Sequence, residues 1–136
     1  MRYILNLVLV VALIGISCGN NTKSSSATNE ANIPFVQNIS LADIPAIKNT
    51  KPSVKFLDVR TPQETAEGVI NGALKIDYRS KDFKKELEQL DKSQSYIVYC
   101  KSGGRSAKSA EIMQQMGFES IYNLEGGYDA ISASKQ

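Results

Sequence analysis

The chain contains no histidine and only two cysteines, Cys18 and Cys100, among its 136 residues. A Cys–His protease or hydrolase needs an imidazole as its base, so the sequence excludes that class of enzyme. A zinc site draws its ligands mainly from cysteine and histidine, and two cysteines alone cannot supply a full set. We therefore expect neither a bound metal nor a cofactor.

The sequence also lacks a strong excess of one charge. The 16 Lys and Arg residues outnumber the 14 Asp and Glu residues by two, and one of these cations is Arg2, close to the N-terminus. A nucleic-acid-binding protein usually carries a basic field. The sequence therefore predicts no nucleic-acid partner.

No apolar run is long enough to span a membrane, which takes about 20 residues. The apolar stretch Ile4–Ile16 is shorter, and a basic residue before it and small residues after it are typical of a secretory signal peptide. We assign this signal to residues 1–17. Cys18 follows it in a context similar to the lipobox of bacterial lipoproteins, in which the cysteine is lipidated and becomes the mature N-terminus. Gly15 stands where a lipobox usually has leucine, so simple secretion with a free Cys18 is the alternative.

Residues 18–32 are mostly Asn, Thr, Ser and Ala, with few charges and no apolar periodicity. Such a segment cannot bury enough surface to offset its ordering entropy, so we expect a flexible tether. Residues 33–136 are enough for one domain with one core. The prediction is an exported domain, lipid-anchored through Cys18 at the bacterial cell envelope, on the periplasmic or the outer face. If Cys18 is instead free, a disulfide with Cys100 is possible.

Short β-branched and aromatic runs alternate with amphipathic helical patterns through this domain. Thr61 and Glu64 form a predicted capping box with Pro62 at the first helical position. This alternation predicts an α/β fold with a parallel sheet of about five strands and helices on both faces. The expected strands are 35–39, 54–59, 72–76, 96–100 and 120–123. The expected helices are 41–48, a short one from 62, 82–90, 106–116 and 128–132. The 106–116 helix should face inward with Ala107, Ala110, Met113 and Met116, and a tight turn is expected at Gly126-Gly127 before the last helix.

The organising stretch is the strand that ends at Cys100, followed by a Gly-Gly turn and an Ala-rich helical pattern that begins near Arg105. Ligands bind at the carboxyl ends of parallel strands, and a loop entering a helix points its backbone N–H groups inward. The helix N-terminus, Lys101, Arg105 and Lys108 should all favour the thiolate. Cys100 is therefore predicted to be an activated nucleophile. The predicted active loop consists of Lys101, Ser102, Gly103, Gly104, Arg105 and Ser106.

The spacing between Cys100 and Arg105 limits what this loop can hold. Four residues separate them, one fewer than in the C-x5-R loop of Cys-based phosphatases. The ring of N–H groups is therefore small for phosphate and suits one extra sulfur atom. Here the chain resembles the rhodanese family of sulfurtransferases, whose single-domain bacterial members have active loops similar to CKSGGRS.

Three further stretches extend the resemblance over nearly the whole domain: FLDVRTPQE, EGVINGA and LEGGYDA, at residues 56–64, 67–73 and 124–130. Val69 and Tyr128 stand where the family commonly has histidine and tryptophan. We expect Tyr128 to pack in the core rather than to act in catalysis.

Asp58 and Arg60, within the first of these stretches, are assigned supporting roles. Asp58 lies at a strand end, where its carboxylate can accept hydrogen bonds from the active-loop backbone. Arg60 can pair with an acid or line the rim of the site. An ordinary surface or loop salt bridge is the alternative for both residues.

The resemblance implies a sulfurtransferase of the thiosulfate type. Cys100 would take sulfane sulfur from a small anionic donor such as thiosulfate, hold it as a persulfide and pass it to cyanide or a thiol. Lys101 and Arg105 would orient the donor. Two alternatives remain: a non-catalytic rhodanese module that binds sulfur or docks a protein, and an arsenate- or phosphate-type Cys enzyme, which the short loop disfavours.

Overall fold

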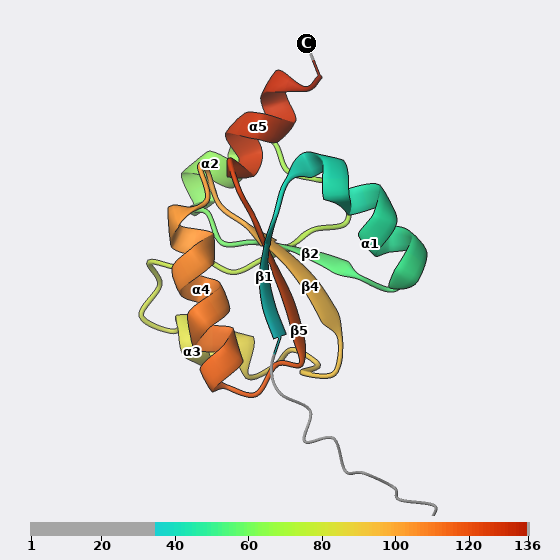
Figure 1. Cartoon of the computed structure of the whole chain (residues 1–136). Coiled ribbons are helices and arrows are strands. Elements are labelled where there is room, and N and C mark those ends of the chain that lie inside the picture. The colour runs from blue at the N-terminus through green and yellow to red at the C-terminus, as the bar shows by residue number, and fades with distance from the viewer. Residues whose placement is uncertain (1–34, 136) are drawn as a thin grey trace, which may run out of the picture.

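The computed structural model describes residues 35–135. Its strands are β1 (Phe35–Ile39), β2 (Lys55–Asp58), β3 (Leu74–Lys75), β4 (Ser95–Tyr99) and β5 (Ser120–Leu124). They form one five-stranded sheet in the order β1-β5-β4-β2-β3, and every adjacent pair is parallel (Figure 1). The predicted signal peptide, Cys18, the tether and the first two residues of the predicted domain lie outside the described residues.

Helices cover both faces of this sheet, as the predicted α/β fold requires. They are η1, a 3₁₀ helix (Leu41–Asp43), α1 (Ile44–Thr50), α2 (Pro62–Ala66), α3 (Phe83–Leu87), α4 (Gly104–Gln115) and α5 (Gly127–Ala133). α3 and α4 lie on one face, and α1 and α5 lie on the other (Figure 1). No helix within residues 35–135 has the length and apolar character needed to cross a membrane.

β4 lies in the middle of the sheet and is buried along its whole length. Its side chains alternate between two apolar cores, because successive residues of a strand point to opposite faces. Val98 and Cys100 pack with Met113 of α4, whereas Ile97 and Tyr99 belong to the core that contains Ile131 of α5. An interior parallel strand is covered on both faces, which explains its continuous apolar sequence.

Pro45 lies in the first turn of α1 rather than in the middle of a helix. The predicted helix over residues 41–48 is instead divided into η1 and α1, and α1 extends to Thr50. A proline in the first turn removes no helical hydrogen bond, because the N–H groups there have no partner within the helix. The proline therefore moves the start of the helix without breaking it.

The strand predicted at residues 72–76 is shorter than expected. Only Leu74 and Lys75 pair with β2, and Gly72 has a φ of 76° in the preceding turn. The Ile76 N–H still donates to the Asp58 carbonyl at 3.0 Å. The chain therefore leaves the sheet gradually at this edge.

The buried stripe of α4 also differs from the prediction. The sequence favoured Ala107, Ala110, Met113 and Met116 as inward residues, but Ala107 and Met116 are only partly buried. The buried positions are Ser106, Ser109, Ala110 and Met113. Two serines are buried because each hydroxyl finds a backbone acceptor, which removes the penalty for burying a polar group.

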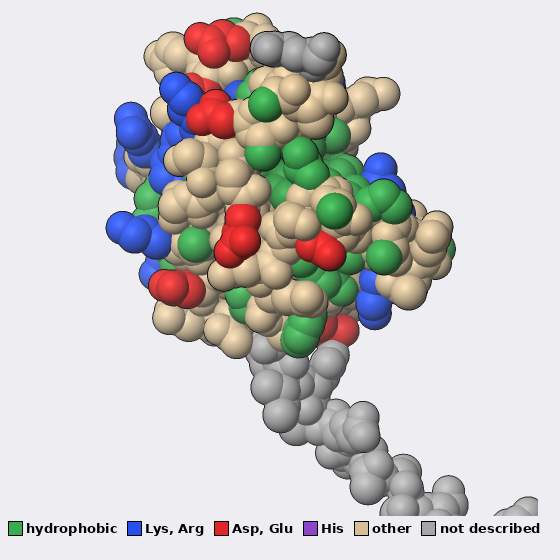
Figure 2. Space-filling view, turned by 45° about the horizontal axis from the view of Figure 1, so that its top comes forward, with side chains coloured by type: hydrophobic (Ala, Val, Ile, Leu, Met, Phe, Trp, Pro, Cys, Tyr) green, Lys and Arg blue, Asp and Glu red, His purple; other side chains and the backbone are tan. Residues whose placement is uncertain are grey.

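The surface mixes both signs of charge. In the view of Figure 2, Lys and Arg lie mainly along the left edge, Asp and Glu lie among them and across the middle, and apolar side chains lie right of centre. Phe35 is the large hydrophobic residue that is most clearly exposed within residues 35–135, at 47%.

Candidate active site

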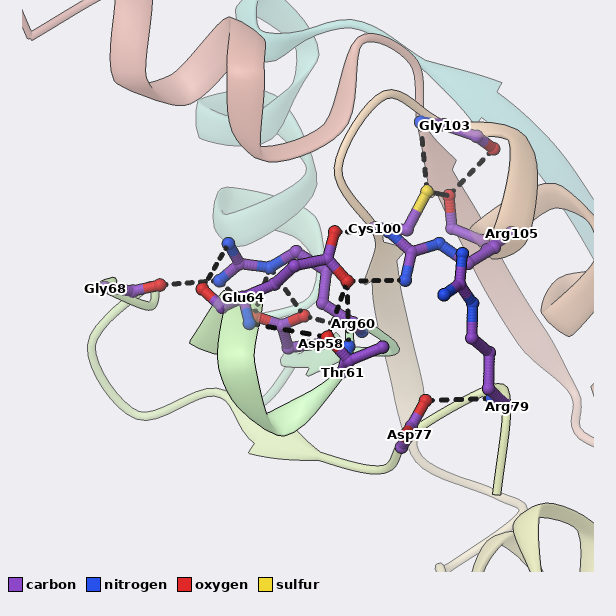
Figure 3. Close-up of polar contacts among 11 residues, drawn as sticks. Asp58, Arg60, Thr61, Glu64, Gly68, Asp77, Arg79, Cys100, Gly103 and Arg105 are labelled. Atoms are coloured by element: carbon purple, nitrogen blue, oxygen red, sulfur yellow. Dashed lines mark hydrogen bonds and ion pairs between the residues drawn. The ribbon is translucent and has the colours of Figure 1, made fainter. Parts of the chain in front are cut away.

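Cys100 directly follows β4, and its thiol lies under the loop that leads into α4 (Figure 3). Only 1% of the residue is exposed. It packs in the core between the sheet and α4, which contains Ala110 and Met113. The strand and helix thus fix the sulfur at the carboxyl end of the sheet, where the sequence placed it.

The sulfur receives hydrogen bonds from the start of α4. The Gly103 N–H donates to Cys100 Sγ at 3.1 Å, and Ser106 Oγ lies 3.6 Å from Sγ. Ser106 Oγ also lies 2.9 Å from the Gly103 carbonyl oxygen, and its single proton can serve only one of the two acceptors at a time.

These contacts decide the protonation of the thiol. Burial raises the pKa of Cys100, but hydrogen bonds from the Ser106 backbone and hydroxyl and from the Gly103 and Ser102 N–H groups outweigh it. The pKa therefore lies below its ordinary value. A thiolate is a far better nucleophile than a thiol, so the site increases the reactive form at neutral pH.

Gly103 makes this convergence of N–H groups possible. It is the N-cap of α4 with a φ of 104°, a left-handed conformation that glycine adopts without steric cost. The N–H groups of a first helical turn have no partner within the helix, so they are free to bind the sulfur.

The predicted role of the lysines needs correction. Lys101 and Lys108 are exposed, and the largest contributions that lower the thiol pKa come from backbone N–H groups and a hydroxyl. Exposed charges are screened by water, whereas the first-turn groups touch the sulfur. The sequence predicted that the helix N-terminus and three cations together favour the thiolate. In the structure, the groups at the helix N-terminus contribute most of this effect.

Arg105 is held by an acid from another element. Its two terminal nitrogens contact both carboxylate oxygens of Glu64 in α2, at 2.7 and 2.6 Å (Figure 3). The hydrogen bond from Arg105 is the largest cause of the lowered pKa of Glu64, which is about 2. The pKa of Arg105 is raised chiefly by Glu64, and Cys100 adds a smaller contribution. Arg105 is thus close to the thiol but already paired.

The start of α5 fixes the active loop from the other side. The N–H groups of Tyr128 and Asp129 donate to the carbonyls of Cys100 and Lys101 at 2.8 and 3.0 Å. The backbone approaches so closely at Gly127 that a Cβ there would lie 2.4 Å from the Cys100 oxygen. Only glycine fits at this position.

Asp58 and Arg60 form a buried pair behind the site, with exposures of 0% and 3%. The Asp58 carboxylate accepts hydrogen bonds from the Arg60 backbone N–H and guanidinium at 2.7 to 3.1 Å. The hydrogen bonds that hold this carboxylate come mainly from Arg60, and the Tyr99 hydroxyl adds another, whereas the sequence pointed to the active-loop backbone as the donor. Arg60 does pair with an acid, as one of its expected roles required, and the resulting salt bridge is buried rather than on the surface.

Arg60 connects several segments at this end of the sheet. It donates to the carbonyls of Glu64 and Gly68 at 3.1 and 2.6 Å. The Tyr128 ring lies over its guanidinium, 3.9 Å from the ring centroid. Tyr128 thus packs, as predicted, but against a cation as well as against Tyr99.

The sequence alone did not indicate that Glu64 and Gly127 belong to the site. Glu64 was assigned only to the capping box with Thr61, which the structure confirms, and its second partner lies 41 residues away. Such a contact leaves no local pattern. The Gly126-Gly127 pair did indicate a tight turn, but nothing local indicated that this turn packs on the Cys100 carbonyl.

A cavity of about 430 Å³ lies near α2 and the segment after β3. Cys100 is not among its lining residues. Within residues 35–135, no group of three or more His, Cys, Asp or Glu side chains is placed to hold a metal ion. The cavity is lined by Arg60, Pro62, Thr65, Lys75, Asp77, Ser80 and Glu86.

The chain is similar to known proteins in both sequence and structure. The model of the rhodanese-like domain family matches residues 41–134. The chain is 34% identical over 92 residues to the putative sulfurtransferase YtwF of Bacillus subtilis, covering 68% of this chain and 86% of that protein. It is 33% identical over 89 residues to a tRNA uridine(34) hydroxylase of Cytophaga hutchinsonii, covering 63% of this chain but 28% of the hydroxylase. The crystal structure of a rhodanese-like domain protein from Staphylococcus aureus superimposes with a TM-score of 0.61 at 31% identity, over 69% of this chain and 89% of that one.

Proposed function

Because the chain belongs to the rhodanese-like domain family, we propose that it is a sulfurtransferase that carries sulfane sulfur as a persulfide on Cys100. The single observation that supports this most strongly is the environment of Cys100 Sγ. The sulfur lies 3.1 Å from the Gly103 N–H, and its pKa is lowered by neighbouring N–H and hydroxyl groups. Attack on a sulfane sulfur requires a thiolate and no separate base, which suits a chain without histidine.

The first half-reaction loads the enzyme. With thiosulfate as the donor, the Cys100 thiolate attacks the outer sulfur atom and forms a new S–S bond. The S–S bond of thiosulfate breaks, and sulfite leaves with the bonding electron pair. The charge is conserved, since a thiolate and a dianion become a persulfide anion and the sulfite dianion.

The second half-reaction unloads it. Cyanide or a thiolate attacks the outer sulfur of the persulfide, and the Cys100 thiolate leaves with its electron pair. Preorganised N–H groups at the start of α4 stabilise the anion on Cys100 before and after transfer, as the donors of an oxyanion hole do. The loop therefore serves both half-reactions with the same groups.

Thiocyanate production from thiosulfate and cyanide tests this proposal. The wild-type protein should turn over, and Cys100→Ser should be inactive because an alcohol cannot form the persulfide. Cys18→Ser is the matched control, since it removes the other cysteine, and it should keep full activity. A wild-type protein that is folded but inactive with several sulfane donors would favour the non-catalytic module instead.

The N-terminal segment completes the proposal. Residues 1–17 serve as a lipoprotein-type signal peptide, and Cys18 carries a lipid that anchors the domain at the bacterial cell envelope. The support is the apolar run Ile4–Ile16 followed directly by small residues and a cysteine. Expression in a bacterium fed an alkyne fatty acid should label the wild-type protein, and Cys18→Ser should prevent labelling. An unlabelled wild-type protein in the culture medium would favour simple secretion.

A further inference from the structure

Glu64 neutralises the arginine of the active loop. Its carboxylate forms a two-point pair with Arg105 at 2.6 and 2.7 Å, so both terminal nitrogens of the guanidinium are engaged (Figure 3). With a pKa of about 2, Glu64 is ionised at every pH at which the protein would act. The charge that Arg105 would offer to an anionic donor is therefore balanced locally.

Glu64 is also held in place from its own helix. The N–H and hydroxyl of Thr61 both donate to Glu64 Oε2 at 3.0 Å. To draw the charge of Arg105 away from Glu64, an incoming anion would have to break both of these hydrogen bonds and leave the carboxylate unbalanced. A two-point arginine–carboxylate pair is among the stronger polar contacts in proteins. We expect it to persist while the donor binds.

Arg60, behind the loop, is buried and paired with Asp58, and the other cations near the loop are exposed. Lys101, Lys108 and Arg79 all project into solvent, and the Arg79 side chain extends toward Arg105 in Figure 3. Water and salt screen such charges. A donor at the sulfur consequently meets uncharged N–H groups and a neutralised ion pair, an environment that stabilises one negative charge better than two.

We propose that Glu64 is a positioning residue that sets donor specificity, shifting the site toward monoanionic sulfane donors and away from dianionic ones. Hydropersulfides and thiosulfonates are the favoured chemical class, and thiosulfate belongs to the disfavoured class. This inference rests on the proposed sulfur transfer. With a thiosulfonate, the Cys100 thiolate takes the terminal sulfur, the S–S bond breaks, and a sulfinate anion leaves with the electron pair.

Two donors of nearly equal shape separate charge from size. Methanethiosulfonate has a methyl group where thiosulfate has a charged oxygen, so the pair differs by one unit of charge. The measurement is kcat/KM for each donor at constant ionic strength, expressed as the ratio of thiosulfate to methanethiosulfonate. In Glu64→Gln this ratio should rise about tenfold over wild type, the size expected when one nearby charge is removed from a partly screened site.

Two control variants separate the local charge of Glu64 from the net charge of the protein and from the length of the side chain. Glu67→Gln makes the same change in net charge at an exposed position three residues further on and should leave the ratio unchanged. Glu64→Asp keeps the charge but shortens the side chain, so it should lower kcat/KM for both donors while the ratio stays near the wild-type value. Thermal unfolding of each variant establishes that the compared proteins are folded.

An unchanged ratio in folded Glu64→Gln overturns the inference and assigns Glu64 to holding Arg105 in place. An equal rise in Glu67→Gln also overturns it, because the effect would then come from net charge alone. If Glu64→Gln does not fold, Glu64→Asp decides. A tenfold change in its ratio of thiosulfate to methanethiosulfonate kcat/KM would contradict the inference, because the charge is unchanged in this variant. A ratio equal to that of the wild-type protein would support the inference. Failure of the proposed function is distinct, since the wild-type protein would then accept sulfur from neither donor.

Discussion

At the scale of single residues, the site activates a thiol without any imidazole. Cys100 is buried, which by itself would disfavour the thiolate, yet its pKa is lowered because the surrounding hydrogen-bond donors outweigh burial. The sequence could predict that Cys100 and its loop form the site, since the residues are contiguous. It could not predict which neighbour contributes most, because the lysines are adjacent in sequence but exposed in space.

Ser106→Ala should reduce the reactivity of Cys100 at neutral pH. The variant loses a hydroxyl that lowers the thiol pKa, so the pKa rises and less thiolate is present. One such hydrogen bond is worth about 1 kcal/mol, which corresponds to roughly fivefold slower alkylation at pH 7. At a pH well above both pKa values the two rates should converge.

Ser109→Ala is the matched control for this experiment. Ser109 is also buried on α4, but its hydroxyl donates to the Arg105 carbonyl at 2.8 Å and not to the sulfur. Its pH profile for alkylation should match that of the wild-type protein. A Ser106→Ala profile that also matches would show that the hydroxyl does not affect the thiol.

Arg60→Met should be strongly destabilising. Asp58 is fully buried and its carboxylate is bound by the Arg60 guanidinium, so the variant leaves an unpaired charge in the core. Breaking such a pair from one side typically costs about 3–5 kcal/mol. Urea unfolding measures the change in free energy of unfolding.

The double variant Asp58→Leu/Arg60→Met tests the reason. With both charges removed, no unpaired ion remains, and a substantial part of the stability should return. If the double variant is less stable than Arg60→Met alone, the charge of Asp58 is not the cause of the loss.

At the scale of elements, two helix N-termini enclose one loop. α4 supplies N–H groups to the sulfur, and α5 binds the carbonyls of Cys100 and Lys101. The sequence predicted both helices and the glycine turns that precede them, because turn signals are local. The packing of α5 on the active loop brings together residues that are far apart in the chain. The hydrophobic periodicity of the two segments cannot predict such a contact.

Gly127→Ala should displace the active loop. The added Cβ would lie 2.4 Å from the Cys100 carbonyl oxygen, and the φ of 52° adds strain for any residue with a side chain. We expect a loss of stability of about 2–4 kcal/mol from the two effects together. Sulfur transfer should fall with it.

Gly72→Ala separates strain from the clash. Gly72 has a φ of 76°, but a Cβ there would contact nothing within 4 Å. This variant should lose only the roughly 1 kcal/mol expected for a left-handed alanine and should keep its sulfurtransferase activity. Equal effects of the two substitutions would mean that the contact with Cys100 is unimportant.

Loop length is the second property of these elements that can be tested. Inserting one glycine between Gly103 and Gly104 converts C-x4-R into C-x5-R and moves N–H donors away from the sulfur. Losing one preorganised donor costs roughly a hundredfold in rate, so thiosulfate turnover should fall by about that factor. Phosphate or arsenate should then protect Cys100 from alkylation better than in the wild-type protein.

Insertion of a glycine after Gly72 controls for a longer chain, since a side chain at Gly72 would contact nothing within 4 Å. It should leave turnover unchanged. If the loop variant keeps full activity and gains no protection by oxyanions, loop length does not select sulfur over phosphate.

At the scale of the whole molecule, the fold could be predicted almost completely. Alternating strand and helix patterns lead to a parallel sheet, and β4 shows the continuous apolar sequence of an interior strand. The errors lie in the buried face of α4 and at boundaries such as Pro45 and Gly72, where local sterics decide where an element begins or ends. The long-range pairs, Glu64 with Arg105 and Gly127 with the Cys100 carbonyl, depend on the finished packing and could not be predicted.

The central claim is that Cys100 carries sulfur as a persulfide, and mass spectrometry of the protein after exposure to a sulfane donor tests it most directly. Wild-type protein treated with thiosulfate or methanethiosulfonate, without an acceptor, should gain one sulfur atom on the peptide that contains Cys100. Adding cyanide should remove that atom and release thiocyanate. Cys100→Ser should gain no sulfur. A wild-type protein that is folded, has a free thiol and gains no sulfur from either donor would contradict the account.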